Sequence, residues 1–166
     1  MRPIGLVVLV LVALPALASA RAWKGVEPGA TTQAEVTAKF GEPTARTKRS
    51  GRTVLAYHGE QALEGTKQVQ FHLDAQGVVA EITVFVGAEL DAESIEGTYG
   101  KPPKRTFVED TFRKVWLYPA AGVTVYFDRD GKVEALLYGP GKKGQARTAG
   151  EPDAAHQAQA ASGAPR

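Results

Sequence analysis

Polar and apolar positions alternate along much of the chain in short segments that end at glycine, proline or aspartate, a pattern typical of β-strands joined by tight turns. The alternation is clearest in residues 68–74, where Val69, Phe71 and Leu73 are apolar and the residues between them are polar. Strands are expected at residues 44–49, 52–58, 68–74, 79–86, 105–108, 112–118, 123–128 and 133–138. Because the links between successive segments are short, neighbouring strands should run antiparallel.

A short helix is expected before the first strands. Thr32 and Glu35 have the spacing of a capping box, in which each side chain accepts a hydrogen bond from an otherwise unpaired backbone N–H. Val36 and Phe40 then form one apolar stripe. Gly41, with a proline two residues later, ends the helix after about two turns.

The same signals recur in the second part of the chain and predict a tandem duplication. The first unit would comprise residues 21–86 and the second residues 87–140. The expected fold class is therefore α+β, with two tandem helix-plus-antiparallel-sheet units, helices on one face and an open sheet on the other. The residues that carry the second helix signal are Asp91, Ile95, Tyr99, Gly100 and Pro102.

Both ends of the chain differ from this central part. Residues 1–20 contain one basic residue, Arg2, then an apolar run and the small residues Ala18-Ser19-Ala20, as in a cleaved signal peptide. The alternative is an uncleaved N-terminal anchor. Residues 141–166 contain no bulky apolar side chain and are expected to form a disordered tail.

Composition narrows the compartment and the class of partner. An exported protein is expected in the periplasm or outside the cell, including the periphery of the outer membrane, with no transmembrane span in the mature chain. There is no cysteine, so neither a disulfide nor a lipid anchor on cysteine is expected. The 20 Lys+Arg and 18 Asp+Glu residues leave a formal net charge of +2, which does not favour nucleic-acid binding.

Residues suited to catalysis or metal binding are few, and no catalytic residue, metal or cofactor is expected. His72 and Asp74 share one strand face, but no activated nucleophile accompanies them, so a solvated pair is favoured over a general base. Residues 128–131 begin like a calcium loop, but the distal glutamate of such a loop is missing. Asp128 and Gly131 are instead expected to form a hairpin turn.

Aromatic side chains on strands give the main indication of binding. Trp116, Tyr118 and Tyr126, with Tyr57, are candidate protein-binding residues, because Tyr and Trp supply much of the energy at interfaces. Tyr126 should lie on the strand face that points away from the helices. The alternative is that these rings stiffen the sheet or belong to the core.

Four basic residues surround the first predicted hairpin turn: Arg46, Lys48, Arg49 and Arg52. They are candidates for contact with an anionic surface, such as lipid or an acidic partner. The alternative is a solvated turn whose charges protect an edge strand from aggregation.

Three stretches together resemble a known family. GVEPGATTQAEV, followed by FGEP and then VQFHLDAQGVV, is similar to the SmpA/OmlA, or BamE-like, domain, and the two-unit arrangement resembles the beta-lactamase inhibitor protein fold. The resemblance implies a non-enzymatic protein-binding module of the envelope or periplasm, linked to outer-membrane maintenance. The alternative that it implies is a secreted or periplasmic enzyme inhibitor or ligand carrier. The identity of the partner stays open.

Overall fold

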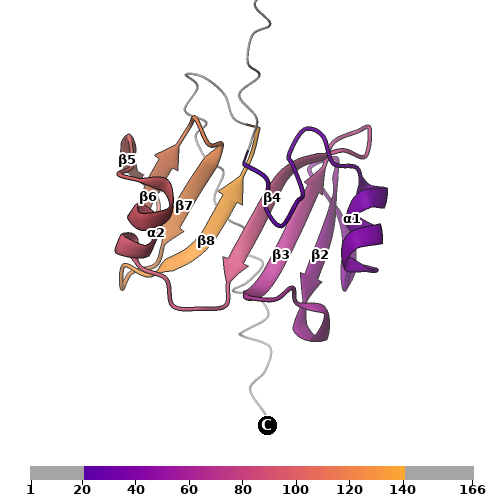
Figure 1. The fold of residues 1–166 in the computed structure, drawn as a ribbon, viewed down its shortest axis with the longest axis horizontal. Coiled ribbons are helices and arrows are strands. Elements are labelled where there is room, and N and C mark those ends of the chain that lie inside the picture. The colour runs from indigo at the N-terminus through magenta and orange to yellow at the C-terminus, as the bar shows by residue number, and fades with distance from the viewer. Residues whose placement is uncertain (1–20, 141–166) are drawn as a thin grey trace, which may run out of the picture.

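The computed structural model describes residues 21–140, which form one eight-stranded antiparallel sheet and two short α-helices (Figure 1). The strand order is β1-β2-β3-β4-β8-β7-β6-β5, so β1 and β5 are the edges and β4 pairs with β8 in the middle. The helices are α1 (Gln33–Phe40) and α2 (Ala92–Tyr99), and a 3-10 turn, η1 (Gly59–Gln61), follows β2. The strands are β1 (Ala45–Arg49), β2 (Arg52–His58), β3 (Thr66–Leu73), β4 (Val79–Val86), β5 (Lys104–Phe107), β6 (Lys114–Tyr118), β7 (Val123–Phe127) and β8 (Val133–Tyr138).

The expected fold class, two tandem helix-plus-sheet units, is wrong. All eight strands belong to a single sheet, because β4 and β8 form a direct backbone ladder in which Ile82 is opposite Tyr138 and Phe85 is opposite Ala135. Local patterns of caps, turns and alternation cannot indicate such a ladder, since it joins segments far apart in sequence. The proposed disordered tail and signal peptide lie outside the described residues.

Both helices begin and end where the sequence predicts. The Thr32 side chain accepts a hydrogen bond from the Glu35 backbone N–H at 3.3 Å, and the Thr32 N–H donates to Glu35 Oε2 at 2.7 Å, which completes the capping box. At α2, Asp91 Oδ1 accepts from the Ser94 N–H at 2.9 Å. Each helix has eight residues, too short to be stable in isolation, so both depend on packing against the sheet.

Both helices pack on the same sheet face, here called the helix face. Val36 of α1 and Ile95 of α2 belong to one hydrophobic cluster with inward side chains of β2, β3, β4, β6, β7 and β8. Phe71 is fully buried there, and burying a side chain of that size stabilises the fold by about 2–3 kcal/mol. Among the described residues, neither helix has the length or apolar character that a membrane crossing needs.

The first described residues cross the helix face between the two helices (Figure 1). The Arg21 guanidinium lies 4.9 Å from the centroid of the Tyr99 ring of α2, and the Arg21 N–H donates to the Ala121 carbonyl at 3.2 Å. The Trp23 ring lies 6.2 Å from the rings of Phe40 and Phe71. This segment therefore connects the packing around α2 with the packing around α1.

Candidate protein-binding face

Three of the four candidate aromatic residues lie on the helix face. Tyr57, Trp116 and Tyr118 all belong to the large cluster under the helices. The Tyr57 hydroxyl donates to the Gly41 carbonyl at the end of α1 at 2.9 Å, and the Tyr118 hydroxyl donates to the Gly100 carbonyl at the end of α2 at the same distance. In the structure these side chains therefore pack the core, and the two tyrosines hold the helix ends.

Tyr126 lies on the other side of the sheet, which we call the opposite face. It is paired across the ladders with Val115 of β6 and Ala135 of β8, and both point away from the helices. Together with Leu117 and Phe85 these residues form a second hydrophobic cluster, here called the opposite-face cluster. Among the described residues, the other hydrophobic side chains that pack with it are Val108 and Leu137.

The hydroxyl of Tyr126 has no hydrogen-bond partner among the described residues. The side chain is 1% exposed, and the oxygen itself is buried. Burial raises the pKa of Tyr126 to about 12; the Glu81 carboxylate adds to that rise, and the Arg113 guanidinium opposes it. Tyr126 is thus a neutral phenol at physiological pH.

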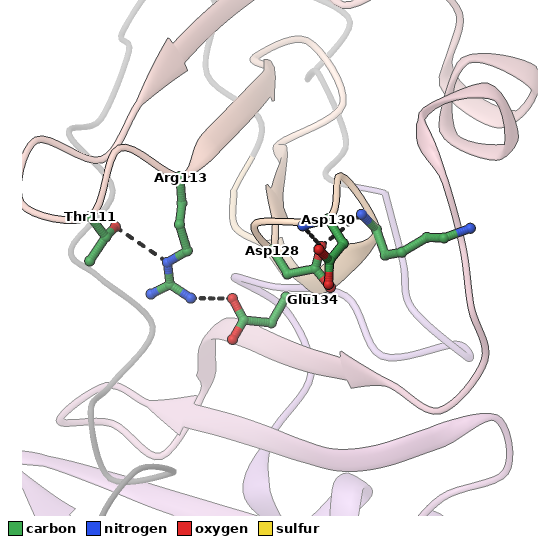
Figure 2. Close-up of polar contacts among 6 residues, drawn as sticks. Thr111, Arg113, Asp128, Asp130 and Glu134 are labelled. Atoms are coloured by element: carbon green, nitrogen blue, oxygen red, sulfur yellow. Dashed lines mark hydrogen bonds and ion pairs between the residues drawn. The ribbon is translucent and has the colours of Figure 1, made fainter.

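An ion pair lies at the end of β6 near this cluster. The Arg113 guanidinium contacts the Glu134 carboxylate and also donates to the Thr111 hydroxyl at 3.3 Å (Figure 2). The Arg113 side chain is 15% exposed, so the pair is partly shielded from water. This ion pair joins the residue directly before β6 to β8.

The polar part of the opposite face lies over β2, β3 and β4. His72 of β3 is paired across the ladders with Val54 and Glu81, and its Nε2 lies 3.3 Å from the Thr83 hydroxyl. Burial lowers the pKa of His72 to about 4, with further lowering by Arg52 and Arg49. The imidazole is therefore neutral at pH 7.

Asp74, the suggested partner of His72, has a separate structural contact. Its Oδ1 accepts hydrogen bonds from the Gln76 and Val78 N–H groups, both at 2.9 Å. Asp128 does the same in the β7–β8 turn, where Oδ1 accepts from the Asp130 and Lys132 N–H groups at 3.0 and 2.8 Å (Figure 2). Within residues 21–140, no three His, Asp or Glu side chains are grouped closely enough to hold a metal ion.

The basic residues of the first hairpin do not form a single patch. Arg46 is opposite the core residue Leu55, so it points to the helix side, and Lys48 follows by alternation. Arg49 and Arg52 face each other on the opposite face. Contact with an anionic surface stays a prediction, with the four cations divided between the two faces of the hairpin.

The fold is similar to that of a solved structure, a DUF4309 family protein (YjgB) from Bacillus subtilis subsp. subtilis strain 168. The TM-score is 0.55, the two chains are 19% identical, and the match covers 70% of this chain and 83% of that chain. No family model and no curated protein matches the sequence. At this identity the likeness concerns the fold alone.

This likeness corrects the resemblance drawn from the sequence. The SmpA/OmlA, BamE-like and two-unit inhibitor assignments are not supported, because the structural neighbour is a DUF4309 protein and the eight strands form one sheet. The motifs behind the assignment were helix caps and hairpin turns. Such motifs stabilise many helix-and-sheet proteins and therefore do not identify a family.

The opposite-face cluster was largely missed by the sequence analysis. Its signal was present in β6, where Val115 and Leu117 alternate with Trp116 and Tyr118, so that both faces of the strand are apolar. A strand with two apolar faces is typical of a sheet that is covered on both sides.

Proposed function

We propose that the protein is an exported, non-enzymatic protein-binding module, and that it binds its partner through the opposite-face cluster. One observation carries the proposal: the Tyr126 hydroxyl is buried without a partner inside an apolar surface away from the helices. A buried hydroxyl without a hydrogen bond costs about 1–3 kcal/mol, so a partner whose binding opens the cluster and supplies an acceptor would recover free energy there.

The chemistry of this face suits a protein surface. Four strands contribute to it, β4, β8, β7 and β6, which at about 4.8 Å per strand gives an apolar width of roughly 15–19 Å. Buried apolar side chains with a few polar anchors are typical of the centres of protein interfaces. Export is supported by the N-terminal sequence pattern, which lies outside the described residues.

Site-specific photo-crosslinking in the envelope of the producing cell tests this proposal. A crosslinking residue at Leu137 lies beside the cluster, whereas one at Gln70 lies on the polar part of the same face. We expect a partner adduct from position 137 and little or none from position 70. The Tyr126→Ala variant should lower the yield at position 137 at least several-fold.

Thermal unfolding of each variant checks that the fold is retained. Equal adducts from both positions, or a yield at position 137 that Tyr126→Ala leaves unchanged, would contradict the proposal.

A further inference from the structure

The β5–β6 hairpin presents two aromatic side chains to solvent. Among residues 21–140, Phe107 and Phe112 are the large hydrophobic side chains that are exposed, at 63% and 81%. Phe107 is opposite Lys114 in the ladder, so these two side chains share one side of the hairpin. Exposed aromatic rings beside basic groups are common features of recognition surfaces.

The backbone holds Phe112 outward in an unusual conformation. Its φ is +53°, a left-handed value that a bulky residue rarely adopts. Two hydrogen bonds close the loop around it, from the Val108 N–H to the Arg113 carbonyl at 2.9 Å and from the Phe112 N–H to the Val108 carbonyl at 2.8 Å. By contrast, Ser50-Gly51 forms the tip of the β1–β2 hairpin, where a short polar residue and glycine tolerate positive φ. Strain of this kind persists where the surrounding structure fixes it and is often found at binding sites.

A hollow of about 520 Å³ lies next to Phe112, and its charge is mainly positive. Lys114 and Arg129 line it, and neither has an ion-pair partner in the part of the chain that the structure describes. Arg113 contributes a third cation that already contacts Glu134, and the carboxylate of Asp128 accepts the hydrogen bonds of its own turn. An anion entering the hollow would therefore meet the two remaining cations.

Aromatic rings hold the ammonium group of Lys114 in place. Its Nζ lies 4.0 Å from the centroid of the Phe127 ring and 5.1 Å from that of Trp116. Such cation–π contacts reduce the freedom of a long side chain. Lys114 is thus already positioned at the hollow, and this reduces the loss of side-chain entropy when a ligand binds.

We propose that this hollow binds an acidic segment of a protein that also carries an apolar side chain. A carboxylate of the segment contacts Lys114 and Arg129, and its apolar side chain packs against Phe112 and Phe107. A flat anionic membrane is a poorer fit than a narrow segment, because it would also approach Glu109 and Asp110 at the hairpin tip, which do not line the hollow and would repel it. The site is separate from the Tyr126 hydroxyl and goes beyond the proposed function.

Fluorescence anisotropy with a labelled synthetic peptide tests the inference. The probe has twelve residues, in which aspartate and glutamate alternate with phenylalanine and leucine, and a second peptide replaces each acidic residue with lysine. We expect saturable binding of the acidic peptide that weakens as salt is raised, and no comparable binding of the basic one. The double variant Lys114→Gln/Arg129→Gln should weaken binding about tenfold, as expected for two partly exposed charge contacts.

Phe112→Gly separates the aromatic contact from folding. Glycine accepts a φ of +53°, so the hairpin should keep its shape, while binding should fall several-fold. The matched control for Lys114→Gln/Arg129→Gln is Lys24→Gln/Lys39→Gln beside α1, which also removes two cations, each next to an aromatic ring, and should leave binding unchanged.

The inference is overturned if the acidic peptide does not bind saturably, or if the lysine peptide binds equally well. Unchanged affinity in the Lys114→Gln/Arg129→Gln variant would also overturn it. Vesicles containing phosphatidylglycerol form a further arm, and binding to them without binding to the peptide would assign the surface to lipid instead. A Tyr126→Ala variant that still binds the peptide would show that this site stands even if the proposed function fails.

Discussion

The two halves of the sheet hold their helices by the same contact but differ on the opposite face. In the first half, Tyr57 donates to the carbonyl that ends α1, and in the second half Tyr118 does so for α2. On the opposite face the first half is more polar, with His72 beside Thr83, whereas the apolar cluster around Tyr126 lies mainly in the second half, with Phe85 of β4 as its member from the first half. The helix face is thus constrained by packing in both halves, and the opposite face is where the two halves differ in chemistry.

The largest effect should come from removing the contacts that the halves share. Tyr57→Phe and Tyr118→Phe should each lower the free energy of unfolding by about 1–1.5 kcal/mol, because each removes a partly buried hydrogen bond to the residue that ends a helix. Urea denaturation followed by circular dichroism measures both values. If only one of the two variants loses stability, the two helices are not held by equivalent contacts.

A tyrosine-to-phenylalanine substitution on the opposite face should change the free energy of unfolding in the other direction. Tyr126→Phe removes a buried hydroxyl that has no partner, so we expect the free energy of unfolding to rise by up to about 1 kcal/mol. The same denaturation series gives this value. A decrease equal to that of Tyr118→Phe would show that the Tyr126 hydroxyl is satisfied in the free protein.

The smallest effect at neutral pH concerns the polar part of the opposite face. Burial and the nearby Arg52 and Arg49 lower the pKa of His72 to about 4, so the folded state binds fewer protons than the unfolded state between that value and about 6.5. The stability that the neutral His72 contributes is fully present above the pKa of this histidine in the unfolded state. It is lost as pH falls through the pKa in the folded state. Stability should therefore decrease on acidification from about pH 6.5 to 4, and His72→Gln should remove that part of the decrease.

Thermal unfolding across this pH range measures the effect. The control is His58→Gln, which removes the histidine at the end of β2, whereas His72 lies on β3. An identical pH profile for the parent protein and His72→Gln would contradict the prediction.

Local signals in the sequence predicted the elements well. The capping residues Thr32 and Asp91 and the terminal Gly41 and Gly100 each control backbone groups within a few positions, so their effects are visible without the rest of the fold. The side of the sheet on which a strand side chain lies was harder to predict. Alternation shows only that Trp116 and Leu117 point in opposite directions.

The pairing of β6 with β7 decides which direction faces the helices. Trp116 is opposite Val125, a residue of the helix-face core, and so its side chain lies on the helix face. Tyr126 was placed correctly because the neighbouring Val125 and Phe127 are strongly apolar. The hollow beside Phe112 depends on the meeting of two turns distant in sequence, and no local pattern indicates it.

The seam between β4 and β8 has a consequence for how the molecule folds. Ile82 and Tyr138, which lie opposite each other there, are 56 positions apart (82 to 138), and closing a loop of that length costs roughly 3–4 kcal/mol of chain entropy. The centre of the sheet can therefore form only after β8, the last strand among the described residues, has been synthesised. Until β8 emerges, β4 is a bare edge, and the period before that closure is when the chain is most exposed to aggregation.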